Sequence, residues 1–114
     1  NYTNFTFRMV VGAAGGSRIP TGVFAAIFNH IFMNKSITEA IAARRLHHQL
    51  VPYELQFESN FDGEILRNLK EEFGHEMLEN KPDGGFAAVT GISVINGKVE
   101  AAFDPRRGGS IQIF

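Results

Sequence analysis

The stretch Val10-Val11-Gly12-Ala13-Ala14-Gly15-Gly16-Ser17-Arg18-Ile19-Pro20 joins a strand pattern to a helix pattern. Alternating apolar residues predict a strand over Phe5–Val11, which ends in a continuous apolar run. Small residues from Gly12 to Ser17 then interrupt the strand, because glycine permits positive φ and a close approach of the backbone. Pro20 suits the first turn of a helix, and the apolar period continues that helix to about Met33. The stretch therefore predicts a strand, a glycine turn and a helix.

Local start and stop signals divide the rest of the chain. Ser36 and Glu39 have the spacing of a capping box, so a second helix is expected from Ile37 to about Arg45. Asp62 is a candidate cap for a third helix, and Gly74 is a candidate stop. Further elements are predicted as follows: a connection over Leu46–Pro52, strands over 54–58 and 76–78, a loop over Lys81–Gly85, a hairpin of 86–95 and 99–103 around Asn96-Gly97, and an edge strand over 111–114.

This order of elements, β-α-α-β-α-β-β-β, is typical of an α+β fold in which helices pack on a mainly antiparallel sheet. The strand over Phe5–Val11 begins almost at residue 1, so we expect it either at an edge of its sheet or paired with a segment outside these residues. A chain of 114 residues allows one domain of modest size or a piece of a larger one.

Composition excludes several classes of function. Eleven basic and twelve acidic residues give a net charge of −1, which provides no electrostatic footprint for nucleic acid or an anionic membrane. The absence of cysteine excludes a disulfide scaffold, a thiol nucleophile and a cysteine zinc site. The longest apolar run, Gly22–Phe28, is far shorter than the roughly 20 residues that span a bilayer. No direct membrane contact is expected from this chain.

Four segments together resemble γ-glutamyltransferases (glutathione hydrolases), in the order and near the spacing of that family. They are Val10–Ile19, Arg45-Leu46-His47-His48-Gln49-Leu50-Val51-Pro52, Gly91–Val99 and Asp104-Pro105-Arg106-Arg107-Gly108-Gly109. The resemblance implies the αββα sandwich of the N-terminal-nucleophile hydrolases. It also implies a precursor that cleaves itself, after which the new N-terminal threonine of the small subunit attacks γ-glutamyl substrates such as glutathione.

In terms of this family, residues 1–114 are expected to be a single partial domain, the C-terminal portion of the small, catalytic subunit. The nucleophilic threonine is then expected upstream, so this chain carries no catalytic residue of its own and is expected to be inactive alone. Its expected partners are a γ-glutamyl compound, the large subunit and the rest of the small subunit, with no cofactor.

Gly16, and then Gly15, are the best site candidates, because acyl transfer needs donors aimed at a developing oxyanion and the family's Gly-Gly pair lines the γ-glutamyl pocket. The structural alternative is a plain strand-to-helix turn. Phosphate binding is disfavoured because neither G-x-G-x-x-G nor G-x-x-x-x-G-K-[ST] is present. Arg45, Asp104 and Arg106 match family positions and are expected to tie helix ends, tail and loops together.

The pair His47-His48 is interpreted as structural, because neighbouring residues on a strand point to opposite sides and no third ligand has metal-binding spacing. No metal site is predicted. Three sequons, at Asn1, Asn4 and Asn34, are candidate glycosylation sites. Together with the family, they favour a protein that is secreted or lies on the extracellular face of the plasma membrane.

Three other functions stay open at this point. An acylase of the same fold could act on different amides. A catalytically dead, truncated paralogue could serve as an interaction or decoy module. A free-standing α/β module could bind a small ligand at the glycine loop.

Overall fold

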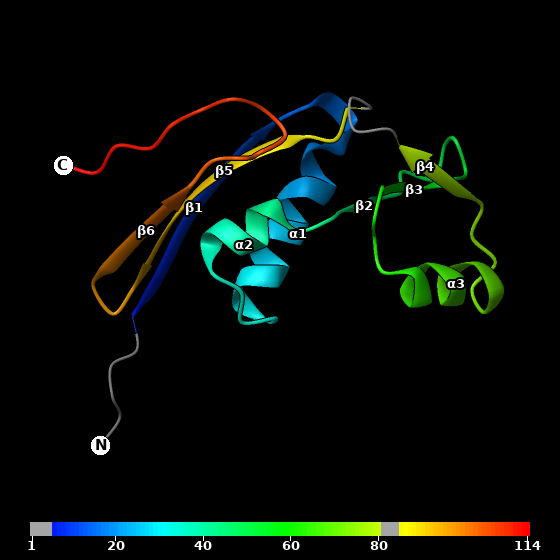
Figure 1. Cartoon of the computed structure of the whole chain (residues 1–114), viewed down its shortest axis with the longest axis horizontal. Helices are drawn as coiled ribbons and strands as arrows, with labels where there is room; N and C mark the ends of the chain where they lie inside the picture. Colours follow the sequence, from blue (N-terminus) through cyan, green and yellow to red (C-terminus); the bar gives the residue numbers. More distant parts are fainter. Residues whose placement is uncertain (1–5, 81–84) are drawn as a thin grey trace, which may run out of the picture.

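The computed structural model describes residues 6–80 and 85–114, and Figure 1 shows two sheets side by side with helices beneath them. The elements in chain order are β1 (Phe7–Ala14), a 3-10 turn η1 (Gly16–Arg18), α1 (Ile19–Ile31), α2 (Ile37–Ala42), β2 (Leu46–His47), β3 (Leu55–Glu58), α3 (Gly63–Glu71), β4 (Met77–Asn80), β5 (Ala88–Ile95) and β6 (Lys98–Ala102).

The first sheet has the strand order β1-β5-β6 and is antiparallel throughout. Strand β1 lies at its edge, as expected, and pairs with β5 from Phe7↔Ile95 to Ala14↔Ala88. Helices α1 and α2 cover one face of this sheet (Figure 1). The buried core between the two layers consists of Ala26, Ile37, Ile41, Val89 and Ala102.

Alternation along β1 decides which residues reach this core. Met9, Val11 and Ala13 pack against the buried cluster, whereas Val10, on the opposite face, is 73% exposed. The predicted alternation of core-facing and exposed residues along this strand is therefore confirmed, although the strand extends three residues beyond the predicted end at Val11. The start predicted at Phe5 lies outside the described residues.

A close approach of α2 to the first sheet depends on Gly91 in β5. A Cβ atom at this position would lie 3.3 Å from Cδ1 of Ile37 and 3.4 Å from Cδ1 of Ile41. The missing side chain lets two isoleucines of the helix reach the sheet surface, so the two layers pack closely.

The second sheet has the order β2-β3-β4, in which β2 and β3 are antiparallel and β3 and β4 are parallel. Strand β2 lies in a segment that the sequence analysis treated as a connection, because two residues give no periodic signal. Strand β3 differs from the expected half-buried pattern, because its polar residues Gln56 and Glu58 are buried along with Leu55. Both polar side chains have hydrogen-bond partners.

Most of the local signals are confirmed. Ser36 and Glu39 form both bonds of a capping box, and Asp62 accepts hydrogen bonds from the amides of Glu64 and Ile65. Helix α2 is shorter than predicted, because it ends at Ala42 where Ala43 turns to extended backbone. Asn96 and Gly97 both have positive φ, as a two-residue hairpin requires.

The predicted tail strand is wrong. Residues 111–114 are not in a strand, and Phe114 and Ile113 are largely exposed. After β6 the chain turns at Asp104–Arg107 and leaves the sheet (Figure 1), so the tail has no neighbouring strand with which to form a ladder.

Four of the five residues in the predicted loop, 81–84, lie outside the described residues. In the part of the chain that is described, no helix has the length and apolarity needed to cross a membrane.

The packing of α2 on the first sheet predicts the effect of a core truncation. Ile41→Ala should lower the free energy of unfolding by about 2–4 kcal/mol, because it removes buried methyl groups and leaves a cavity. Ile92→Ala on the opposite, open face of the sheet is the matched control, since Ile92 is 49% exposed. Urea denaturation measures both variants, and equal losses would contradict the assignment of the core.

Candidate functional site

The glycine loop joins the end of β1 to the first turn of α1. Gly15 has φ 147° and Gly16 has φ 64°, values that side-chain-bearing residues rarely adopt. A Cβ atom on Gly15 would lie 2.6 Å from Cα of Ala87, so this glycine is also required by close contact with the chain before β5. At Gly16 a Cβ atom would have no heavy atom within 4 Å, so the surface there is open.

The two glycines therefore have different roles in the loop. Gly15 fixes the loop against Ala87, and Gly16 presents open backbone at the start of η1. The first amides of a helical turn have no partner within the helix, so they are free to donate to an external acceptor. This arrangement can supply hydrogen-bond donors to an oxygen that develops negative charge. This is the chemistry that the sequence predicts for the pair.

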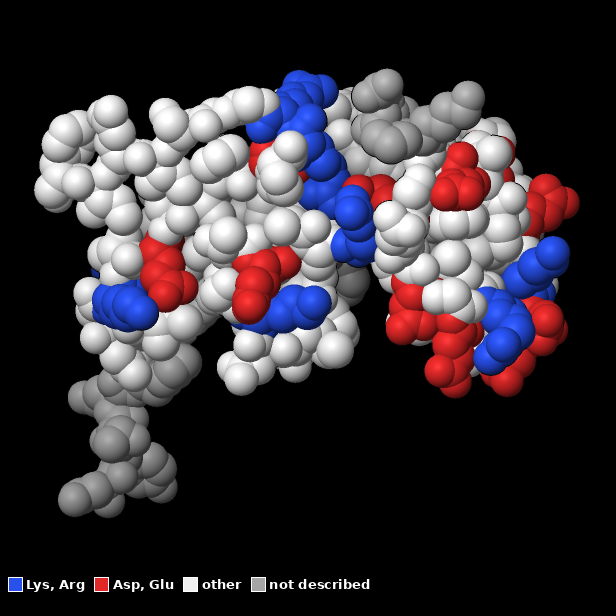
Figure 2. Space-filling model, viewed as in Figure 1, with Lys and Arg blue, Asp and Glu red and all other residues white. Residues whose placement is uncertain are grey.

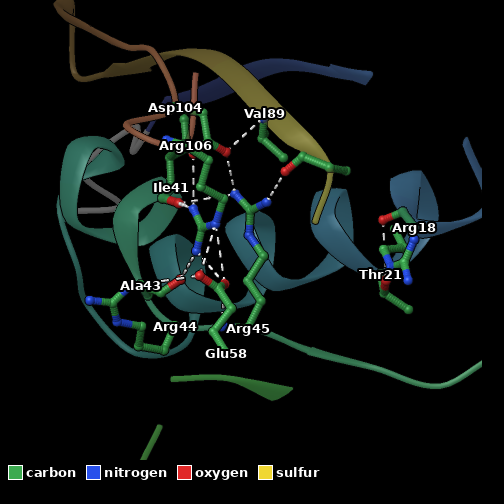
Figure 3. Close-up of polar contacts among 11 residues, drawn as sticks. Arg18, Thr21, Ile41, Ala43, Arg44, Arg45, Glu58, Val89, Asp104 and Arg106 are labelled. Atoms are coloured by element: carbon green, nitrogen blue, oxygen red, sulfur yellow. Dashed lines mark hydrogen bonds and ion pairs between the residues drawn. The ribbon is translucent and has the colours of Figure 1, made fainter. Parts of the chain in front are cut away.

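A buried ion pair joins Arg45 and Asp104 (Figure 3), and it is linked to this loop through Ala87. Both side chains are about 1% exposed, and Nη2 of Arg45 donates to Oδ2 of Asp104 at 2.8 Å. The same Nη2 donates to the carbonyl of Ile41, and Nη1 donates to the carbonyl of Ala87. Because Ala87 contacts Gly15, the guanidinium of Arg45 supports the loop through Ala87.

A second, partly buried ion pair joins Arg106 to Glu58 of β3. Nε and Nη2 of Arg106 donate to the carboxylate of Glu58, while Nη1 donates to Asp104 Oδ1 at 2.9 Å. The guanidinium also donates to the carbonyls of Ile41 and Ala43 at the end of α2. Glu58 further accepts from the amide of Arg45 at 2.9 Å. The four charged residues thus form one network that joins α2, β3, β5 and the turn after β6.

Glu58 was missed by the sequence analysis. It occupies a position that an alternating strand would expose, and it lies in none of the four segments that carried the resemblance. The sequence did hold one indication of a carboxylate partner, the surplus of arginines in those four segments, since buried guanidinium groups need carboxylate partners. That signal indicates a partner but does not identify which of the chain's carboxylates it is.

Burial and hydrogen bonding shift the pKa values of Asp104, Arg106 and Arg45 in this network. Burial alone would raise the pKa of Asp104, but hydrogen bonds from the amides of Arg106 and Val89 and from the Arg106 guanidinium outweigh it and lower that pKa. Burial acts against charge on Arg106 as well, yet its bonds to Glu58 and Asp104 raise its pKa. Burial lowers the pKa of Arg45, which stays protonated because a guanidinium titrates far above neutrality.

His47 is buried and uses both ring nitrogens. Nε2 lies 2.9 Å from Oε1 of Gln49, whose amide nitrogen donates to the carbonyl of Val51. Gln49 Oε1 is therefore an acceptor for the Nε2–H of His47, and Nδ1 of the same ring is hydrogen-bonded to the hydroxyl of Thr21 at 2.7 Å. These bonds tie β2 to α1, which is the structural role interpreted from the sequence.

His48 points to a different set of partners. Its Nδ1 accepts from the amide of Leu50, and its ring packs edge-on against Tyr53 and His75. Adjacent histidines therefore do not converge on one point. Over residues 6–80 and 85–114, no three histidine, cysteine, aspartate or glutamate side chains gather as metal ligands would.

Among the sequons, only Asn34 is described by the structure. It is exposed in the connection between α1 and α2, with φ 53°. Asn1 and Asn4 lie outside the described residues, so their predicted modification gains no structural detail.

The buried position of Arg45 predicts that it matters far more than its neighbour Arg44. Arg45→Ala should cost about 3–5 kcal/mol of unfolding free energy, because it leaves the Asp104 carboxylate buried without its partner. Arg44→Ala should cost less than about 1 kcal/mol, since its contact with Glu58 is 3.7 Å long and its side chain is 54% exposed. Urea unfolding compares the two, and similar costs would contradict the network.

The lowered pKa of Asp104 predicts a pH dependence with a definite sign. The ionised Asp104 carboxylate stabilises the folded state fully when the pH is above the pKa of an unfolded aspartate, about 3.9. This stabilisation is lost as the pH falls through the lower pKa that Asp104 has in the folded state. Asp104→Asn should therefore be much less stable than the parent at pH 7, and the gap should narrow as the pH falls below about 4. Asp62→Asn is the control, because asparagine caps a helix as well as aspartate does. Urea unfolding at pH 7 and pH 3 measures both variants, and a gap for Asp104→Asn that stayed constant would contradict the assignment.

Comparison with known proteins identifies relatives along nearly the whole chain. The family model described as gamma-glutamyltranspeptidase matches residues 3–114. Scoloptoxin SSD14 of Scolopendra dehaani is 43% identical over 105 residues, which cover 90% of this chain and 18% of that protein. Glutathione hydrolase proenzyme 2 of Schizosaccharomyces pombe is 34% identical over 107 residues, or 93% of this chain and 17% of that protein.

A solved structure gives the same result for the fold. The gamma-glutamyltranspeptidase of Pseudomonas nitroreducens, complexed with L-DON, has a TM-score of 0.79 and 28% sequence identity, covering 93% of this chain and 55% of that chain. The chain thus spans less than a fifth of the two sequence relatives and about half of the solved chain. The expected α+β class is confirmed, and it is that of the N-terminal-nucleophile hydrolases. On the strength of a family model that matches all but its first two residues, this chain belongs to the gamma-glutamyltranspeptidase family.

Proposed function

We propose that this chain is the C-terminal part of the small subunit of a γ-glutamyl hydrolase and transferase that acts on glutathione and other γ-glutamyl amides. Membership of the gamma-glutamyltranspeptidase family supports this assignment. So does the relative named as a glutathione hydrolase proenzyme, which is 34% identical over 93% of this chain.

The observation that carries the proposal is the glycine loop. Gly15 is held against Ala87 so closely that no side chain fits, while Gly16 leaves its backbone open. A loop that is held in place at Gly15 and open at Gly16 suits a substrate pocket, because such a loop can place amide donors beside the reacting carbonyl. Its hydrogen bonds would be stronger to the oxyanion of the transition state than to the neutral carbonyl.

In the proposed reaction, the hydroxyl of an N-terminal threonine attacks the γ-carbonyl carbon and gives its proton to the terminal amine. The carbonyl oxygen becomes an oxyanion, which the loop amides stabilise. When the C–N bond breaks, the departing amine takes the proton and an acyl-enzyme remains. Water or an acceptor amine then attacks the same carbon and releases the threonine.

The threonine, the large subunit and the groups that hold the substrate's α-amino and α-carboxylate ends belong, in this proposal, to parts of the protein outside residues 1–114. The relatives are several times longer than the matched region, which is consistent with this division. The proposed location is outside the cell, as a secreted or surface-bound protein. The exposed Asn34 suits a glycosylated protein of that kind.

The proposal predicts that one loop glycine is needed for turnover and that a nearby glycine is not. In the full-length protein, Gly16→Ala should lower kcat/KM for a γ-glutamyl anilide about 100-fold, because alanine strains the positive φ and moves the amide. Gly12→Ala is the matched control, since this glycine lies in β1 without positive φ and with open space at its Cβ position. It should retain nearly full activity.

The 114-residue chain alone should show no turnover in the same assay. Activity of the isolated chain would contradict a nucleophile outside it. A full-length protein that is folded but inactive would favour the alternative of a catalytically dead interaction module. Equal losses in the two glycine variants would remove the loop from the proposed site.

A further inference from the structure

A cavity of about 740 Å³ lies beside the network of Glu58 and Arg106, and no residue of the glycine loop lines it. Its walls come from the end of α2, the turn after β3, and the turn after β6. This volume falls within the range of about 300–1,000 Å³ that is typical of small-molecule sites. In Figure 2, one band of Lys and Arg atoms runs down the middle of the visible face, and smaller groups lie on either side of it.

The charges around this cavity do not cancel. Glu58, at its wall, is paired with Arg106 through the shared hydrogen bonds already described. Asp104 is likewise paired with the buried Arg45. Arg44 and Arg107 also line the cavity, so the described residues leave two positive charges there without a full counterion.

Within the described residues, neither of these two arginines is held tightly. Arg44 is 54% exposed, and its one contact with Glu58 is 3.7 Å long. Arg107 is exposed, and within residues 6–80 and 85–114 it forms no ion pair. Both guanidinium groups are therefore free to turn toward a ligand, and a guanidinium fork matches the two oxygens of a carboxylate or phosphate.

The rest of the lining suits an organic anion. Ser59 and Asn60 offer a hydroxyl and an amide, while Phe86 and Pro105 offer an apolar surface. Small-molecule sites commonly combine an apolar wall with a few polar groups that set orientation. A ligand with a short carbon skeleton could thus contact the apolar side while its acidic groups reach the arginines.

We propose that this cavity binds a small organic dianion whose two acidic groups, carboxylate or phosphate, pair with Arg44 and Arg107. This site is separate from the glycine loop, and the proposal does not depend on γ-glutamyl chemistry. Failure of one proposal leaves the other intact, because the dianion is tested by binding and the loop by turnover.

The test is a titration of the full 114-residue chain with succinate and with phosphate, followed by amide chemical shifts in a ¹⁵N correlation spectrum. Saturable shifts are expected at Ser59, Asn60 and the residues around Arg107. Tighter binding of succinate would indicate a dicarboxylate as the natural ligand, and tighter binding of phosphate would indicate a phosphate ester. Acetate and chloride, each with a single charge, should bind much more weakly than either.

Variants that each remove one arginine charge distinguish specific binding in this cavity from general electrostatic attraction. Arg44→Gln and Arg107→Gln should each weaken dianion binding about tenfold, as loss of a charged hydrogen-bond partner does. Arg67→Gln on the exposed surface of α3 makes the same charge change outside the cavity and should leave binding unchanged. Far-ultraviolet circular dichroism checks that all three variants are folded. The absence of saturable shifts, or an equal loss in Arg67→Gln, would overturn the proposal.

Discussion

The buried ion pair of Arg45 and Asp104 is the constraint on which the packing of α2 against the first sheet depends. Taking two charges out of water costs several kcal/mol for each ion, and only close pairing with further hydrogen bonds offsets this. Here Asp104 also accepts from the amide of Val89, and Arg45 donates to the carbonyls of Ile41 and Ala87. Breaking the pair would therefore leave unpaired polar groups in α2, in β5 and in the turn after β6 at once.

Glycines set how closely the layers approach around this pair. Gly22 of α1 has the side chains of Ala87 and Val89 and the guanidinium of Arg45 within 3.5 Å of its missing Cβ. Gly15 is closer still to Ala87. The same short segment before β5 is thus contacted by a loop glycine, a helix glycine and a buried arginine. The geometry of the glycine loop follows from packing on Ala87 as much as from the turn's own preference.

Local signals were strong enough to predict much of this fold from the sequence. A capping box, an Asn-Gly turn and a strand followed by a glycine loop each act within a few residues, so a single sequence reveals them. Strand β2, the parallel pairing of β3 with β4 and the burial of Glu58 depend on partners far along the chain, and no short pattern encodes them. The isolated tail was mispredicted for the same reason, because an apolar alternation does not say whether a partner strand is near.

The candidate site shows the same division between local and distant information. A glycine pair can be read from the sequence, but a plain turn would look identical, and only the resemblance of four separated segments favoured a site. That resemblance also marked Arg45, Asp104 and Arg106 without saying how they connect. The contact of Gly15 with Ala87, and of Ala87 with Arg45, joins residues from three separate parts of the chain. Periodicity and spacing carry no information about such contacts.

Hydrogen bonds between polar side chains, rather than burial of apolar side chains, position the second sheet against the first sheet and its helices. Helix α3 contributes no buried residue, and Leu55 is the one buried hydrophobic residue of the described chain between Leu46 and Asn80. Across the junction, Gln56 accepts from Arg18, which directly follows the glycine loop, and within the second sheet it also accepts from Asn80 of β4. Each such bond contributes only about 0.5–1.5 kcal/mol, but it fixes direction as well as distance, which apolar contact does not. Together with the Arg106–Glu58 ion pair and the bond between His47 and Thr21, these hydrogen bonds place the second sheet, so its orientation and the geometry of the glycine loop depend on each other.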